Sequence, residues 1–295
     1  MNAISIKNVY ADVGEFQLRA ITLDIPCGCV TGCIGRNGAG KTTLMNTMMG
    51  LQEHHKGKIL FSGKDIREDY EGIMNEVAYL PSHCPYGKNE KVKALLRMGK
   101  PLYPDFDEGM FHHLCQRSNI DHHKKLQQLS LGQQKLVQLY LLLARKPKTL
   151  ILDEPMANLD PITRIEIVEL LRTFMIEEDH TIFISSHILS DLEKLADYMV
   201  IIDKGAILLS QQVDILTETY KIIYFNEEVK QRLPQSYLRY MKKEREGYSA
   251  LCEGKEIDKS LKYRNADMED ILYYLTGGVS NVEENTGISN LILEQ

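Results

Sequence analysis

The sequence predicts an α/β fold built on a mixed sheet, with an antiparallel β subdomain, a helical subdomain and a small α+β C-terminal appendage. Two wholly apolar runs, residues 149–152 and 181–184, are separated by an amphipathic helix over residues 161–175. This order is typical of buried parallel strands joined by a crossover helix. A third apolar run, residues 30–34, precedes a glycine-rich stretch and another helix, which extends the same pattern.

The N-terminal segment predicts the antiparallel β subdomain. Apolar and polar residues alternate in short stretches over residues 4–25, and Asp12-Val13-Gly14 interrupts the alternation. A period of two is typical of strands that bury one face, and glycine favours a turn between them. After the buried strand over residues 30–34, residues 42–50 predict a helix that ends at Gly50.

The middle of the chain predicts a helical subdomain over about residues 83–145, inserted in the sheet. Four prolines between positions 81 and 104 punctuate its early part, and the pattern then stays helical up to Arg145. After the two apolar strands and their crossover helix, residues 198–202 predict a last core strand. We therefore assign residues 1–210 to the first domain.

The C-terminal part has a different pattern. A strand-like run over residues 220–225 and a helical run over residues 268–275 predict a small α+β appendage over residues 211–278. Residues 279–295 are polar and acidic, and we expect them to form a flexible tail because they hold little apolar surface to bury.

Composition excludes several classes of protein. The net charge is −6, and residues 265–295 hold six acids without a lysine or arginine, which speaks against a general nucleic-acid surface. No apolar run approaches the roughly 18 residues that cross a bilayer, and the first residues lack the pattern of a secretory signal. We therefore expect a cytoplasmic protein, in which Cys27, Cys29 and Cys33 are buried thiols rather than disulfides or metal ligands.

A glycine-rich motif, G-x-x-x-x-G-K-T, stands between the strand over residues 30–34 and the helix that follows. In such a loop the glycines let backbone N–H groups turn toward phosphate oxygens, and the helix N-terminus adds partial positive charge. Lys41 is expected to neutralise the β- and γ-phosphates, and the Thr42 hydroxyl to ligate Mg²⁺. The motif predicts a P-loop NTPase core whose phosphate-binding residues are Gly35, Arg36, Asn37, Gly38, Ala39, Gly40, Lys41, Thr42 and Thr43.

Two adjacent carboxylates, Asp153 and Glu154, follow the apolar strand over residues 149–152. Buried carboxylates are costly unless a metal ion or hydrogen bonds engage them. We assign Asp153 to holding Mg²⁺, directly or through water. Glu154 is assigned to orienting and deprotonating the attacking water.

The order of these motifs resembles one family, the ATP-binding cassette (ABC) ATPases, over residues 4 to about 210. Leu129-Ser130-Leu131-Gly132-Gln133 stands where that family has its L-S-G-G-Q signature. The resemblance implies that ATP and Mg²⁺ are the cofactors. It also implies that Ser130, Gly132 and Gln133 act in trans, on the γ-phosphate of ATP held by a second ABC ATPase subunit, in a homodimer or a heterodimer. The local residues alone also allow Ser130 to be only a helix N-cap.

Two further segments match the family. His187, in Ser185-Ser186-His187, resembles the switch histidine, which is implied to contact the γ-phosphate and help to position water near Glu154. Ala157-Asn158-Leu159-Asp160 stands where the family has its D-loop, a segment that crosses the dimer interface.

Three positions depart from the family pattern. Ser82 stands where the family has a glutamine that contacts Mg²⁺ or water, and its shorter side chain implies an indirect contact or none. Val13 replaces the aromatic residue that stacks on adenine, so Phe16 or Tyr10 is the candidate for that role. Leu131 replaces the first glycine of the signature and is expected to point away from phosphate.

Tyr103-Pro104-Asp105-Phe106-Asp107, the short helical insert and the C-terminal appendage resemble bacterial export-type cassettes. The resemblance implies an ATP-hydrolysing subunit, peripheral at the inner face of the cell membrane, that energises a separately encoded integral membrane permease. It places the surface for that permease around residues 82–89 and the helical insert. No nucleic-acid partner is expected.

Two alternatives stay open from the residues. One is a nucleotide-binding regulatory module without turnover, which Glu154 and His187 disfavour. The other is a nucleic-acid- or ribosome-associated ABC ATPase without transport, which the single cassette and the acid excess disfavour.

Overall fold

The computed structural model describes residues 1–103, 105–238, 240–254 and 261–277. The chain divides into two compact units, Met1–Ser210 and Gln211–Gln295. The tail that we predict over residues 279–295 lies outside the described residues.

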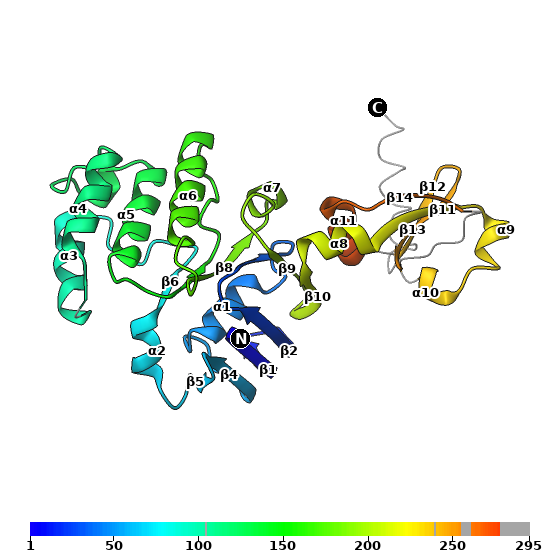
Figure 1. Cartoon of the computed structure of the whole chain (residues 1–295), viewed down its shortest axis with the longest axis horizontal. Helices are drawn as coiled ribbons and strands as arrows, with labels where there is room; N and C mark the ends of the chain where they lie inside the picture. The colour runs from blue at the N-terminus through cyan, green and yellow to red at the C-terminus, as the bar shows by residue number, and fades with distance from the viewer. Residues whose placement is uncertain (104, 239, 255–260, 278–295) are drawn as a thin grey trace. The chain divides into compact units, whose positions relative to one another are not determined.

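The first unit contains a four-stranded antiparallel sheet near the N-terminus (Figure 1). Its strands are β1 (Asn2–Val13), β2 (Phe16–Pro26), β4 (Lys56–Phe61) and β5 (Lys64–Asp65), in the order β2-β1-β4-β5. The predicted strand pair over residues 4–25 is confirmed, because β1 pairs with β2 in antiparallel register and Val13 lies opposite Phe16. Alternate residues of both strands are buried, which is the pattern that the alternation of apolar residues predicts.

The second sheet of this unit carries the predicted parallel core. Its order is β10-β9-β3-β8-β7-β6, and β3, β6, β7, β8 and β9 pair in parallel. These strands are β3 (Val30–Ile34), β6 (Val77–Leu80), β7 (Thr149–Leu152), β8 (Thr181–Ser186), β9 (Tyr198–Asp203) and β10 (Ala206–Gln212). Every residue of β3, β7 and β8 is buried, because helices and the antiparallel sheet pack against them.

Two helices begin at the edge of this sheet where β3 and β7 end. Helix α1 (Lys41–Met48) follows β3, and α6 (Pro161–Phe174) is the crossover between β7 and β8. Asp160 caps α6 by accepting hydrogen bonds from the N–H groups of Ile162 and Thr163, and Pro161 takes the first helical position.

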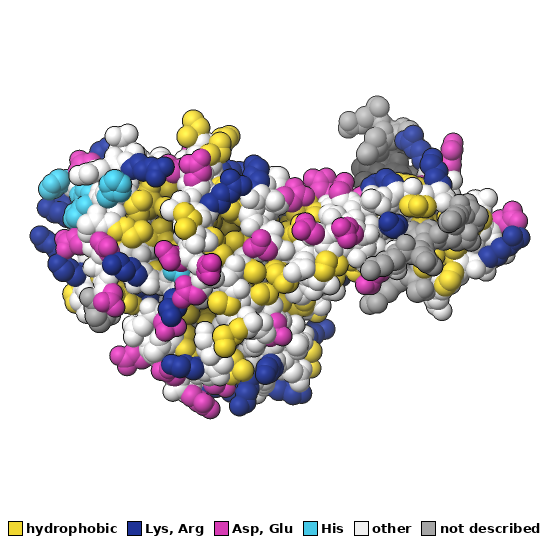
Figure 2. All heavy atoms as spheres, in the orientation of Figure 1, with side chains coloured by type: hydrophobic (Ala, Val, Ile, Leu, Met, Phe, Trp, Pro, Cys, Tyr) yellow, Lys and Arg dark blue, Asp and Glu magenta, His cyan; other side chains and the backbone are white. Residues whose placement is uncertain are grey.

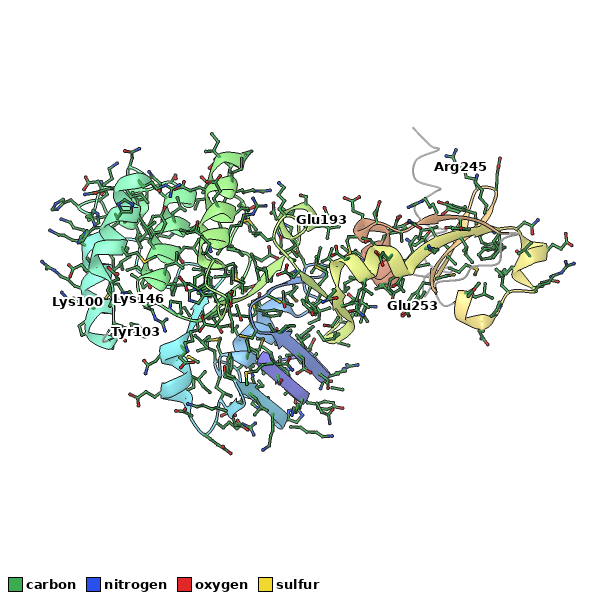
Figure 3. All side chains as sticks on the ribbon, viewed as in Figure 1. Lys100, Tyr103, Lys146, Glu193, Arg245 and Glu253 are labelled. Atoms are coloured by element: carbon green, nitrogen blue, oxygen red, sulfur yellow. The ribbon has the colours of Figure 1, made fainter. Side chains whose placement is uncertain are left out.

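The predicted helical subdomain lies between β6 and β7. It consists of α3 (Val92–Gly99), η1 (Lys100–Leu102), α4 (Glu108–Arg117), η2 (Leu126–Gln128) and α5 (Leu131–Leu143), which gather at one end of Figure 1. The Arg145 guanidinium lies 3.8 Å from the centre of the Tyr103 ring, and Figure 3 labels Tyr103 and Lys100 in this subdomain. This cation–π contact holds the segment between η1 and α4 to the end of the subdomain.

The second unit has its own antiparallel sheet, in the order β12-β13-β11-β14. Its strands are β11 (Tyr220–Phe225), β12 (Met241–Glu244), β13 (Gly247–Glu253) and β14 (Lys262–Asn265), and its helices are α8 (Val213–Thr219), α9 (Glu227–Lys230), α10 (Gln235–Leu238) and α11 (Met268–Gly277). Ile223, Phe225, Ala250, Cys252 and Leu261 form a separate hydrophobic core.

Acidic and basic side chains are interspersed over the visible face of the first unit, without a basic stripe (Figure 2). In the described parts of the chain no helix is both long enough and apolar enough to cross a membrane.

All six cysteines are free. Our prediction of three buried thiols is confirmed for Cys33, which is buried in β3. It is wrong for Cys27, which is exposed because it lies in the turn after β2, and Cys29 is only partly buried.

Candidate functional site

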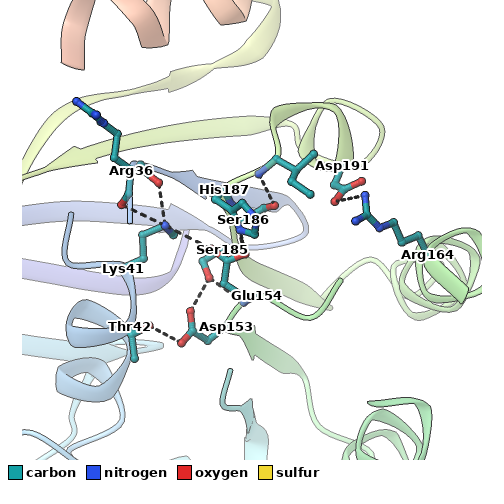
Figure 4. A network of polar contacts seen from close by, with 12 residues as sticks. Arg36, Lys41, Thr42, Asp153, Glu154, Arg164, Ser185, Ser186, His187 and Asp191 are labelled. Carbon is teal, nitrogen blue, oxygen red and sulfur yellow. Dashed lines mark hydrogen bonds and ion pairs between the residues drawn. The ribbon is translucent and has the colours of Figure 1, made fainter. Parts of the chain in front are cut away.

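The glycine-rich loop lies between the end of β3 and the start of α1, at the carboxyl edge of the parallel sheet (Figure 4). Gly38 and Gly40 have backbone φ angles of 80° and 111°, in the region that glycine alone enters at little cost. A Cβ on Gly40 would also lie 2.8 Å from the Phe16 ring, and one on Gly35 would lie 2.4 Å from the Ile202 carbonyl oxygen. The motif glycines are therefore required by conformation and by close packing.

Lys41 opens α1, and its side chain is only 7% exposed. Its ammonium donates to the Gly35 carbonyl oxygen at 2.8 Å and lies 3.3 Å from Glu154 Oε1. The Arg36 carbonyl oxygen is 3.5 Å away, while the residue itself is exposed. The ammonium is thus held over the loop, where it can neutralise an anion that the loop binds.

Asp153 follows β7 and is fully buried. Its two oxygens each accept a hydroxyl hydrogen bond, from Thr42 at 2.7 Å and from Ser185 at 2.6 Å. The structure thus brings together the two residues that we predicted as Mg²⁺ ligands. Ser185 was missed by the sequence reasoning, although it stands two residues before His187 at the end of β8.

Glu154 occupies a strained backbone position, with a φ of 49° that non-glycine residues seldom adopt. The conformation is held at both ends, since its N–H donates to Ser185 Oγ at 2.9 Å and its Oε2 lies 2.6 Å from His187 Nδ1. The His187 N–H also donates to Oε2, at 3.3 Å. The carboxylate is therefore fixed between the imidazole and the Lys41 ammonium.

These groups line one open pocket of about 580 Å³. This volume lies within the range of small-molecule binding sites. Its walls are Phe16, Asn37, Gly38, Ala39, Gly40, Lys41, Thr42, Thr43, Ser82, Glu154, Ala157, Asn158 and His187.

Phe16, rather than Tyr10, is the aromatic residue at this pocket. The Phe16 ring packs against Gly40, whereas the Tyr10 ring lies under the Lys56 ammonium, 4.9 Å from its centre. Val13 is 39% exposed and does not line the pocket. Ser82 does line it, so the structure brings this departure from the family pattern to the phosphate side.

The residues Ser130 to Gln133 lie at the N-terminus of α5 and do not line this pocket. Ser130 caps the helix: its hydroxyl accepts from the Gln133 N–H at 3.1 Å, and the Gln133 side chain accepts from the Ser130 N–H at 3.3 Å. Leu131 is 64% exposed, whereas Gly132 is buried against Thr163. Within one chain, these residues therefore remain separate from the phosphate loop.

A second ion pair links the elements that follow the two carboxylates. Arg164 in α6 lies 3.7 Å from Asp191 in α7 (Leu189–Leu192), the short helix after His187. Since Asp191 is buried, this contact holds the segment after His187 against α6.

Comparisons with known proteins identify relatives of this chain. The family model described as ABC transporter matches residues 18–157. The chain is 30% identical to the ABC transporter ATP-binding protein YtrB of Bacillus subtilis, over 70% of each protein. It is 34% identical to the lantibiotic transport ATP-binding protein SrtF of Streptococcus pyogenes, over 72% of this chain and 91% of SrtF. A solved structure of the ATP binding subunit of an ABC transporter superposes with a TM-score of 0.65 at 24% identity, over 72% of this chain and 91% of that one, and shows the shared fold.

Proposed function

The chain belongs to the ABC transporter family as an ATP-binding and ATP-hydrolysing subunit, and we propose that it hydrolyses ATP at the pocket around Lys41 and Glu154. One observation carries this proposal: the Glu154 carboxylate is held between the Lys41 ammonium, at 3.3 Å, and the His187 imidazole, at 2.6 Å, beside the phosphate loop.

The loop residues bind and orient the triphosphate. Residues 38–43 line the pocket at the start of α1, where the helix dipole adds partial positive charge. Lys41 supplies a full positive charge over the same loop. Phe16 provides an aromatic face next to Gly40 on which a base can stack, which is the role that Val13 cannot take.

The donor set at Thr42 and Asp153 fits Mg²⁺. A hydroxyl and a carboxylate oxygen, 2.7 Å apart, are the hard oxygen ligands that this ion prefers. When bound with ATP, Mg²⁺ neutralises charge on the phosphate oxygens. Ser185 positions Asp153 by donating to its second oxygen, and Ser82 is near enough to the pocket to act through water.

Glu154 acts on the water that attacks the γ-phosphate. Its carboxylate accepts a proton from that water, while His187 fixes its orientation through a contact to Oε2. The strained backbone conformation of Glu154 directs its side chain into the pocket. The hydrogen bond from the Glu154 N–H to Ser185 stabilises this conformation.

The site becomes complete in a dimer of ABC ATPase subunits. Ser130, Gly132 and Gln133 stand at the N-terminus of α5, where Ser130 is exposed, and this is a second position where backbone N–H groups and a hydroxyl can bind phosphate. They serve the ATP held by the partner cassette. Ser130 keeps its N-cap bond to Gln133 and presents its remaining lone pair and proton.

We further propose that the dimer drives a separately encoded permease from the inner face of the membrane, and that transport is outward. ABC ATPases work with membrane subunits, and SrtF is a lantibiotic transport ATP-binding protein. The exposed segment over residues 82–89 and the helical subdomain form the proposed contact with the permease.

Mixing two defective chains tests this arrangement. Lys41→Ala disables the phosphate loop, and Gln133→Ala disables the signature, so each chain alone is inactive. A mixed dimer contains one intact loop facing one intact signature, and we expect ATPase activity to reappear on mixing. An active Gln133→Ala chain, or a mixture without activity although each chain binds its partner, would contradict the assignment in trans.

A further inference from the structure

Helix α5 buries a lysine, Lys135, two residues after Gln133, the last residue of the signature. Lys135 is 8% exposed, and the residues around it on the helix, from Leu136 to Leu143, are buried too. No carboxylate of the described residues lies within 4 Å of its ammonium. A buried ammonium loses its hydration, which costs free energy unless hydrogen bonds compensate for it. A methionine of similar length would pack at this position without that cost.

The ammonium of Lys135 contacts the loop that follows β6. It lies 3.3 Å from the Ser82 carbonyl oxygen and 3.4 Å from the Pro81 carbonyl oxygen. The preceding carbonyl, of Leu80, accepts the N–H of Asp153 at 2.8 Å. Three successive carbonyls therefore connect the Mg²⁺ side of the pocket to α5.

Burial lowers the pKa of Lys135, and the nearby Cys84 and Asp153 offset only part of that decrease. Ser82 itself lines the phosphate pocket, and Lys135 is five residues beyond Ser130, the cap of α5. One side chain thus joins a residue of the pocket to the helix that presents the signature.

We propose that Lys135 is a positioning residue that ties the Ser82 loop, residues 81–86, to helix α5, so that the phosphate pocket and the signature move as one unit. This rests on the proposed function of the pocket and deepens it. The Ser82 side chain is too short to reach far into the pocket, so the backbone of this loop connects the pocket to α5. Lys135 holds that backbone in place.

Gln138 provides a matched control on the same helix. It lies three residues on, so it shares a face with Lys135, and it is 3% exposed. Its Oε1 has no hydrogen-bond partner among the described residues, and its amide nitrogen donates to the Gln134 carbonyl within the helix. Gln138→Met therefore changes the polarity of this face without touching the Ser82 loop.

The test measures hydrogen exchange of residues 82–86 in the nucleotide-free full-length chain, together with kcat and KM for ATP. Lys135→Met should speed exchange of this loop by about tenfold. It should also lower kcat by about tenfold and leave KM within about threefold, because the pocket still binds ATP but is misplaced relative to α5. Lys135→Arg, which keeps a donor for both carbonyls, should restore loop exchange and kcat, and Gln138→Met should behave as wild type.

Unchanged loop exchange in Lys135→Met overturns the proposal, whether or not the wild type hydrolyses ATP. An equal loss of kcat in Gln138→Met also overturns it, because the effect then belongs to helix packing. If Lys135→Met fails to fold, Lys135→Leu carries the same expectations. Slow turnover by the wild type itself, with fast loop exchange in Lys135→Met, counts against the proposed function and not against Lys135.

Discussion

Replacing Gly40 by alanine tests whether a glycine is required at this position both by its backbone angle and by the nearby Phe16 ring. Gly40 has a φ of 111°, and an L-residue in the left-handed region costs about 1–2 kcal/mol. The added Cβ would also lie 2.8 Å from Phe16 Cζ and 3.3 Å from Leu18 Cδ2. Overpacking of this kind costs about 1–3 kcal/mol, so we expect Gly40→Ala to destabilise the first unit by about 2–5 kcal/mol.

Gly38→Ala separates the two contributions. Gly38 has a φ of 80°, but a Cβ there would meet nothing within 4 Å, so only the backbone cost of about 1–2 kcal/mol applies. Phe16→Leu in the Gly40→Ala chain removes the Cζ atom that clashes, and it should recover the difference. Urea unfolding followed by circular dichroism measures stability, and titration calorimetry with ATP measures binding. Equal destabilisation by the two alanines, or no recovery with Phe16→Leu, would refute the reasoning.

Three further predictions address other parts of the first unit. His187→Ala should lower kcat by about 10²–10⁴-fold and leave the dissociation constant for ATP nearly unchanged, because the imidazole orients Glu154 and the loop holds the phosphates; a large loss of ATP affinity instead would place His187 in binding. Burial raises the pKa of the Cys33 thiol to about 12, so it stays protonated at pH 8 while exposed Cys27 reacts. Mass spectrometry after brief alkylation should find Cys27 modified first, and early modification of Cys33 would show that β3 is accessible. Tyr79→Phe removes a 2.8 Å hydrogen bond from the Tyr79 hydroxyl to Asn46 Oδ1, and it should lower the free energy of unfolding by about 0.5–1.5 kcal/mol; an unchanged urea midpoint would mean that water replaces the bond.

The core of the site was predictable because its signals are local or follow from parallel pairing. Glycines that need positive φ angles mark the phosphate loop, and a wholly apolar run marks β3 before it. Glu154 and His187 are 33 residues apart, yet β7 and β8 are parallel neighbours, so their carboxyl ends meet. The same topology brings Asp153 to Thr42.

Other features gave no local signal. Strands β4, β5 and β6 were missed because no regular alternation of apolar and polar residues marks them. The strands β12 to β14 were also missed. A lysine on a helix is ordinarily exposed, so the burial of Lys135 became visible only when α5 was placed against the Ser82 loop.

The contact of Phe16 with Gly40 also depended on tertiary structure. The sequence left Phe16 and Tyr10 equally available, because both belong to the N-terminal strand pair. The register places Val13 opposite Phe16 at the end of that pair, and the ring of Phe16 is thereby brought to the phosphate loop. A shift of a few residues in the register of this strand pair would have placed another aromatic side chain beside the phosphate loop.

Glu154 is the proposed catalytic base of an ATPase. The most direct test of this role is the steady-state ATPase rate of the wild type and of Glu154→Gln, both measured with Mg²⁺ and with the membrane partner present. Glutamine keeps the shape of the side chain but cannot accept the proton from water. We predict ATP hydrolysis by the wild type and a loss of about 10²–10⁴-fold in the rate of Glu154→Gln, with ATP still bound. Equal rates in the two proteins, whether high or absent, would contradict it.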